Sequence, residues 1–297
     1  MLQLRGWMGI GWVVLMASVT ATGCVGAPSR GGEGTKSTGR NKPFVFNWGT
    51  GRVAIEESVE REGEVLTLAW KATLTKEGEQ LRVSFSAGEL VEGLKEALGP
   101  KGTHPLFQVM PDLVVDPSNG RLIAVEGIEK AVKEQGKLGA KSKADERALA
   151  TEAMRGGVDE RARQRWDHWA RLVGFSQAAD SESTDKTELQ LSDGLKMPVV
   201  TTTSHSRVEG ASVVKIVRAF SGASVAKVYK QVLASTGAPK AIVDAVEKVI
   251  REEHYEATIE PTTMRATKIR GRELTTVHNK GGAIELKAAS ETWTFVW

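Results

Sequence analysis

Apolar and polar positions alternate with a period of two in the early part of the chain. In segment 66–74 the apolar side chains take every second position (Leu66, Leu68, Trp70, Ala72 and Leu74), with polar residues between most of them. Successive side chains of a strand point to opposite faces, so this pattern predicts a strand with one buried face. The alternation recurs at 44–48, 53–59 and 81–85, with Glu62-Gly63 and Glu77-Gly78 as turns. We therefore expect an antiparallel meander of four strands with one face in water.

Helical spacing dominates the middle of the chain. The strongest helix candidate is 158–175, whose apolar residues share one side (Val158, Ala162, Trp166, Trp169 and Val173). The sequence Pro117-Ser118-Asn119-Gly120 is a hairpin turn signal, and it predicts pairing of the short strands that flank it, 113–116 and 122–125. Shorter helices are predicted at 89–98, 128–133 and 144–154.

The last third is predicted to return to strands, with a helix pair among them. After a polar loop at 178–196, strands 199–208 and 212–220 should pair across Glu209-Gly210. Helices at 225–233 and 239–250 follow, and Gly237 ends the first of them. Three more strands are expected, at 255–259, 264–277 and 283–297. In the last strand the apolar residues change phase, which predicts a β-bulge at 288–290.

The order of these elements indicates the fold class. Strands and helices occur in groups and do not alternate regularly, which predicts an α+β fold with a largely antiparallel sheet. In its element order the chain resembles the LolA and LolB lipoprotein carriers and related envelope lipoproteins. That resemblance implies a half-barrel, in which a curved antiparallel sheet is filled by helices. We expect residues 43–297 to form one such domain.

The N-terminal segment has the pattern of an export signal. Arg5 precedes an uncharged, mostly apolar run at 7–19, and small residues lead up to Cys24. Ala21-Thr22-Gly23-Cys24 resembles the lipobox of bacterial lipoproteins, although Ala21 stands where leucine is usual. The resemblance implies a signal peptide at 1–23 and attachment of diacylglycerol and palmitate-like acyl chains to Cys24. Two alternatives are an uncleaved transmembrane helix and a conventional cleavage site followed by an ordinary cysteine.

Charge separates the next segment from the rest of the chain. Residues 24–42 are rich in Gly, Ser and Thr, and they carry four basic residues against Glu33, so we interpret them as a flexible tether. The whole chain has a net charge of +3; without the tether's +3 and the charge of Arg5, residues 43–297 have −1. A nearly neutral domain argues against nucleic-acid binding. The expected partner of the anchor is a membrane, and Val25 after the cysteine favours the outer membrane.

Candidate chemistry is sparse. The five histidines have no paired metal-ligand spacing, Cys24 is the only cysteine, and no phosphate-binding glycine loop occurs, so we expect neither metal nor cofactor. The segment 222–226 resembles a serine-hydrolase nucleophile elbow, with Ser224 as nucleophile and Asp244 and either His254 or His278 downstream. The simpler interpretation is that Ser221 or Ser224 caps a helix. We therefore expect a protein that is not an enzyme, and a hydrolase is the third hypothesis.

Two hypotheses remain for a domain without catalysis. Trp166, Trp169 and Tyr229 could line a pocket for an acyl chain or another lipid-like ligand inside the half-barrel. The alternative is that the same side chains fill a closed core, as apolar stripes at helical spacing usually do. The protein would then be a structural or interaction module whose partner is another envelope protein. An apolar cavity of several hundred cubic ångströms would favour the first hypothesis, and a packed interior the second.

Overall fold

The structure, a computed structural model, describes residues 44, 46–61, 64–86, 88–92, 109–139, 152–173, 175, 177, 179–190, 196–235, 237–279 and 282–297. The expected signal peptide, Cys24 and the tether lie outside the described residues. Most of the helix expected at 144–154 lies outside them too, as does the turn Glu62-Gly63.

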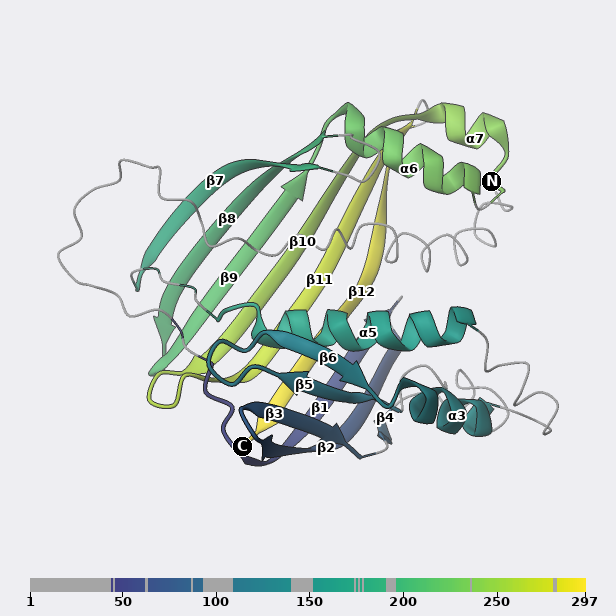
Figure 1. The fold of residues 1–297 in the computed structure, drawn as a ribbon. Helices are drawn as coiled ribbons and strands as arrows, with labels where there is room; N and C mark the ends of the chain where they lie inside the picture. Colours follow the sequence, from purple (N-terminus) through teal and green to yellow (C-terminus); the bar gives the residue numbers. More distant parts are fainter. Residues whose placement is uncertain are drawn as a thin grey trace.

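One antiparallel sheet of twelve strands runs through the part of the chain that the structure describes (Figure 1). Its strand order is β6-β5-β3-β2-β1-β12-β11-β10-β9-β8-β7, and β4 pairs with β2. The strands are β1 (Gly51–Arg61), β2 (Glu64–Glu77), β3 (Gln80–Phe85), β4 (Glu89–Glu92), β5 (Asp112–Val115), β6 (Leu122–Glu126), β7 (Ser181–Gln190), β8 (Lys196–Val208), β9 (Ala211–Phe220), β10 (Val246–Glu260), β11 (Arg265–Asn279) and β12 (Gly282–Val296). The pairing of β1 with β12 joins the early and late strands into one sheet.

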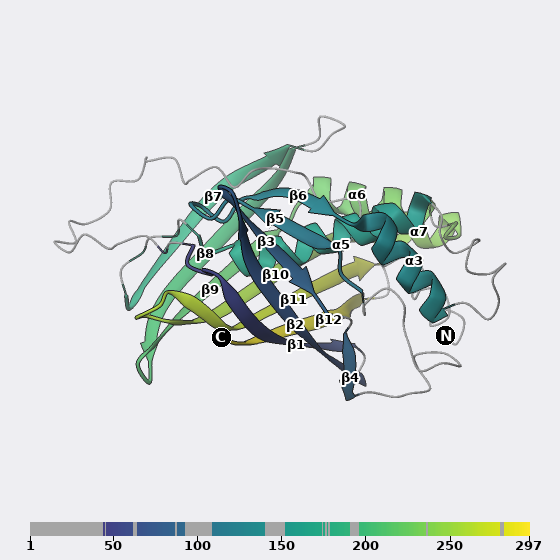
Figure 2. The same cartoon turned by 60° about the horizontal axis from the view of Figure 1, so that its bottom comes forward.

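Helices lie on one side of this curved sheet (Figure 2). They are α3 (Ile128–Gly139), α5 (Glu152–Ala170), α6 (Ala223–Ser235) and α7 (Lys240–Ala245). On the sheet face toward α5, Ile269 and Gly271 of β11 are buried, whereas Lys268, Arg270 and Arg272 on the other face are exposed. The fold is therefore an open, curved, largely antiparallel sheet with a few helices on its concave face, as the α+β prediction requires. None of the described helices is both long and apolar enough to cross a membrane.

Several predicted elements are confirmed. The meander β1–β3, the hairpins β5–β6 and β8–β9 and the long helix α5 occur where the patterns place them. The bulge in the last strand is also present. Between two consecutive pairs, β11 advances two residues, from Arg272 to Leu274, while β12 moves three, from Ser290 to Lys287. The extra residue therefore lies at 288–289, where the phase change predicted it.

The segment around residues 44–48 is not a strand, contrary to the prediction. β1 already has β2 on one side and β12 on the other, so no strand edge is left there for another partner. The segment instead places its aromatic rings in the core, and the N–H of Phe44 donates a hydrogen bond to the carbonyl of Phe175 at 2.8 Å.

Three further predictions are wrong because of tertiary pairing. The polar loop expected at 178–196 contains the edge strand β7, most of whose side chains are exposed, so it has no apolar alternation. The second helix of the late pair ends at Ala245. The following apolar residues begin strand β10, because they pair with β11. The helix expected at 89–98 begins instead as β4, which pairs with β2.

Candidate functional site on the concave face of the sheet

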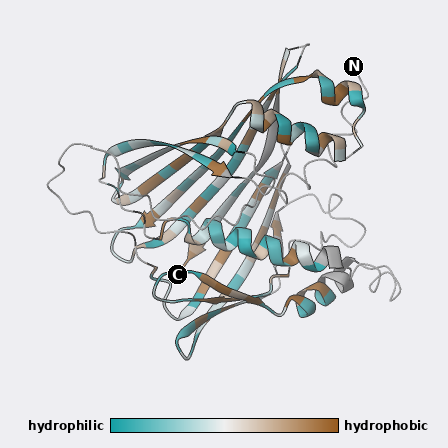
Figure 3. Ribbon diagram, turned by 45° about the horizontal axis from the view of Figure 1, so that its top comes forward, coloured by the Kyte–Doolittle hydropathy of each residue, from teal (hydrophilic) through white to brown (hydrophobic). Residues whose placement is uncertain are grey.

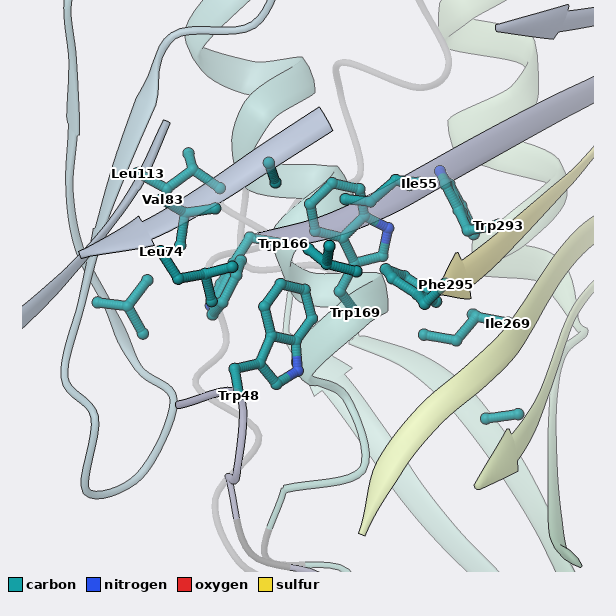
Figure 4. Packing of buried hydrophobic residues seen from close by; sticks show 14 of the residues in the cluster. Trp48, Ile55, Leu74, Val83, Leu113, Trp166, Trp169, Ile269, Trp293 and Phe295 are labelled. Atoms are coloured by element: carbon teal, nitrogen blue, oxygen red, sulfur yellow. The ribbon is translucent and has the colours of Figure 1, made fainter. Parts of the chain in front are cut away.

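The two tryptophans of α5 lie in a closed aromatic core. Trp166 and Trp169 are 1% and 4% exposed, and their ring centroids are 6.4 Å apart. The ring of Trp48 contacts both, at 5.0 Å from Trp166 and 5.9 Å from Trp169. Figure 4 shows these rings packed against side chains from β1, β3, β5, β11 and β12. The sequence prediction that these tryptophans face the interior is therefore confirmed.

A hydrogen bond ties Trp166 to the β5–β6 turn. Its indole N–H donates to the carbonyl of Gly120 at 2.8 Å. Asp116 holds the turn, because its carboxylate accepts hydrogen bonds from the N–H and hydroxyl of Ser118 and from the side-chain amide of Asn119. These bonds, that of the Ser118 hydroxyl first, lower the pKa of Asp116 below its usual value.

A buried ion network crosses the core between α5 and the sheet. Arg165 donates to Glu57 of β1 at 2.6 Å (Nη2 to Oε2). Arg161 donates both to Glu57, at 3.3 Å, and to Glu291 of β12, at 2.8 Å. Glu57 is fully buried. Burial, the largest single cause, would raise the pKa of Glu291, but the charge and hydrogen bond of Arg161 together with the charges of His168 and Arg165 outweigh it and lower that pKa. Two carboxylates thus balance two guanidinium groups, which is the condition for keeping charges inside a protein.

Sequence reasoning missed this network, although a signal for it exists. Glu57 has the parity of Val53, Ile55 and Val59, so it belongs to the apolar face of its strand. Arg165 lies seven residues after Val158, on the apolar side of α5. A charge in the apolar phase of each of two elements predicts a buried ion pair, but not which elements meet. Figure 3 colours α5 mostly hydrophilic, although its Arg165 and Trp166 are buried.

Two small cavities lie beside α5 among the described residues. One of about 30 Å³ lies between the segment around residues 44–48 and α5, with Trp48, Trp169 and Tyr255 in its lining. Another of about 10 Å³ lies beside Arg161 and Arg165. Ligand pockets usually measure about 300–1,000 Å³, so these cavities have the size of single water molecules.

His168 and Tyr255 form the border of the aromatic core. The Tyr255 hydroxyl donates to the backbone carbonyl of His168 at 3.1 Å, and the imidazole ring centroid lies 5.2 Å from that of Trp293. Burial, helped by the charge of Arg171, lowers the pKa of His168 to about 3, so the ring is neutral at physiological pH. On the same tyrosine ring lies the guanidinium of Arg171, with its carbon 5.0 Å from the ring centroid.

Charged side chains continue from this border across the concave face. Arg251 of β10 pairs with Glu273 of β11 at 2.8 Å and with Glu253 at 3.1 Å. Arg218 of β9 lies 4.0 Å from Glu253. We call these four residues the ionic row. It separates the core beneath α5 from a second apolar cluster beneath α6. Burial raises the pKa of Glu273 above its usual value, and Arg251 opposes that shift.

Tyr229 belongs to the second cluster. It is partly buried on α6 and packs with residues such as Val199, Phe220 and Val249. The structure therefore brings Trp166 and Trp169 together but places Tyr229 elsewhere.

The residues of the serine-hydrolase hypothesis do not converge. Ser224 lies on α6, which packs on the concave face, whereas His254 and His278 have the strand parity of the convex face. His254 contacts Glu252 at 3.0 Å, and Asp244 pairs with Lys240. Among the described residues, no group of histidine, cysteine and carboxylate side chains could hold a metal ion.

Comparisons with known proteins identify no family. The sequence matches no family profile and no curated protein. Among solved structures, it is similar to lipovitellin, from a study of lipid–protein interactions, with a TM-score of 0.34 and 8% identity. That match covers 82% of this chain, which spans only 24% of the lipovitellin chain. A porin-like protein from Bacteroides uniformis matches with a TM-score of 0.21 and 8% identity, over 86% of this chain and 98% of that one.

Proposed function

We propose that this chain is a bacterial envelope lipoprotein whose domain acts, without catalysis, as an interaction module for another envelope protein. Acyl chains on Cys24 would hold it to the outer membrane, and residues 24–42 would be the tether. Residues 43–297 would form one half-barrel, with the sheet as its wall and α5 as its main filling helix.

The filled interior is the observation that carries this proposal. The tryptophans expected to line a lipid pocket instead contact one another, Trp48 and the surrounding strands. The cavities there are far too small for an acyl chain. Between α5 and α6 the concave face carries the ionic row, and burying those charges against an acyl chain would be costly. A polar protein surface fits such a face better.

The anchor is tested by acyl labelling in cells. Cells that express the full chain are grown with an alkyne analogue of palmitate, and the purified protein is tested for the label. Wild type should carry the label and fractionate with the outer membrane, because the cysteine of a lipobox is the acylation site. Cys24→Ala should lose the label. Equal labelling of both proteins, or of neither, would remove the anchor from the proposal.

Mass measurement then tests the module against the lipid carrier. The acylated protein is extracted from membranes and weighed under native and denaturing conditions. Covalent acyl chains remain in both spectra, whereas a bound lipid adds mass only in the native one. We expect no additional native mass. A lipid lost on denaturation would make ligand carriage the better hypothesis.

The partner is sought by cross-linking from neighbouring positions on opposite sheet faces. Thr201 of β8 pairs with Arg218 on the concave face, and the next residue, Thr202, points to the convex face. A photoreactive residue at Thr201 should give one discrete cross-linked product in cells, and the same group at Thr202 should give none. Absence of a product from both positions, or the same product from both, would contradict an interaction through the concave face.

A further inference from the structure

The guanidinium group of Arg171 makes no ion pair with any residue that the structure describes. It lies instead over the ring of Tyr255. Asp167 lies one helical turn earlier, at the spacing where helix ion pairs form, yet the pair is not made. Arg165 on the same helix differs completely. It donates to both oxygens of Glu57 and to the sulfur of Met110.

A second arginine lies beside it. Tyr255 is paired with Ile216 of β9, and Arg218 is the next residue of β9 on that face, so it is a diagonal neighbour of the tyrosine ring. Within the described part of the chain, the one ion pair of Arg218 is its 4.0 Å contact with Glu253. The charge of Arg218 lowers the pKa of Arg171, after burial as the larger cause, so the two guanidinium groups repel each other.

The nearby carboxylates do not neutralise this pair at close range. Glu273 and Glu253 both contact Arg251 at 3.1 Å or less. Asp167 makes no ion pair with either arginine; burial raises its pKa above the usual value, and the charge of Arg171, the next largest cause, opposes that shift. Two half-buried guanidinium groups therefore face the concave side with hydrogen-bond donors to spare.

We propose that Arg171 and Arg218 form a binding site for a single oxyanion, a carboxylate or a phosphate group. The planar fork of a guanidinium matches the two oxygens of either group. Tyr255 is the floor of the site and holds Arg171 in place. The source of the oxyanion rests on the proposed function: it would be a group on the partner that covers the concave face.

Titration with small anions tests the site in the full acylated chain in detergent. Inorganic phosphate and acetate are added separately at constant ionic strength, and the midpoint of thermal unfolding is followed. Specific binding raises the midpoint with saturation, because the anion stabilises only the folded state. Arg171→Gln and Arg218→Gln should each weaken binding by about tenfold or more, the loss of one charge-assisted contact. Arg163→Gln, an exposed arginine of α5 paired with Asp159, is the matched control and should bind as wild type does.

Each outcome decides a separate point. A stronger effect of acetate assigns the site to a carboxylate, and a stronger effect of phosphate assigns it to a phosphorylated group or a headgroup. No saturable effect of either anion, or the same affinity in Arg171→Gln and Arg163→Gln, overturns the site. Anion binding without a cross-link from Thr201 would support the oxyanion site and contradict the interaction module. A cross-link from Thr201 without anion binding would support the interaction module and contradict the oxyanion site.

Discussion

Glu57 is a single side chain on which the core beneath α5 depends. It is fully buried and neutralises Arg165, which is 2% exposed, so its removal leaves a buried charge without a partner. We predict that Glu57→Leu lowers the free energy of unfolding by about 3–5 kcal/mol, whereas Glu57→Leu with Arg165→Met restores most of that loss. Urea denaturation followed by tryptophan fluorescence measures both values.

The control for this pair is an ion pair on the outer side of the same helix. Asp159→Ala breaks the exposed pair with Arg163 and should change stability by no more than about 0.5 kcal/mol. If Glu57→Leu lowered the free energy of unfolding by as little as Asp159→Ala, Glu57 would not be needed to neutralise a buried arginine.

His168 predicts a specific dependence of stability on pH. Its pKa is lowered from 6.5 to about 3 in the folded protein, mainly by burial. Between these values the unfolded chain binds a proton that the folded protein does not, so stability falls as the pH decreases through that window. We predict that between pH 6 and pH 4 wild type loses about 1.4 kcal/mol per pH unit more than His168→Phe does. If the free energies of unfolding from urea titrations depended equally on pH in the two proteins, the pKa of His168 in the folded protein would not be lowered.

At the scale of elements, the β5–β6 turn shows how one glycine positions a helix. Gly120 has a φ of +71°, and a Cβ there would come within 2.6 Å of the Phe46 ring, while its carbonyl accepts the bond from Trp166. Gly78 in the β2–β3 turn has a φ of +61° but open space around it. We predict that Gly120→Ala destabilises the protein by about 2–4 kcal/mol and Gly78→Ala by about 1 kcal/mol. Thermal unfolding compares them, and equal losses would mean that the backbone alone sets the cost.

The elements that sequence could predict are those whose side chains carry an apolar period. α5 and strand β2 were predictable because each buries one face against the core. β7 was not, since most of its side chains stay exposed and only its backbone bonds to β8 identify it as a strand. The apolar residues after Ala245 fit either a helix or a strand, and pairing with β11 decides for the strand.

At the scale of the whole molecule, the sheet depends on a contact that no local pattern contains. β1 and β12 come from opposite ends of the described chain, and their register places Glu57 opposite Trp293 and Ile55 opposite Phe295. The buried network and the proposed oxyanion site both follow from such long-range pairings. Sequence could therefore predict the fold class and the inward side of α5, but not which charges meet on the concave face.

The ionic row divides the concave face into two apolar clusters of unequal size, and this division predicts unequal stability. The cluster beneath α5 includes five buried tryptophans and the Glu57 network, whereas the cluster beneath α6 consists mainly of aliphatic residues with Phe220. Because local opening is easier where less apolar surface is buried, α6 should open without unfolding of the rest.

Native-state hydrogen exchange at increasing urea measures this difference. We predict that amides of α6 exchange through an opening of lower free energy and weaker urea dependence than those of α5, which should exchange only on global unfolding. Val225→Ala, in the second cluster, should lower the opening free energy of α6 and leave the α5 isotherms almost parallel to those of wild type. A single isotherm shared by both helices would instead mean that the ionic row couples the two clusters into one cooperative unit, so that an oxyanion bound at Arg171 and Arg218 would stabilise both.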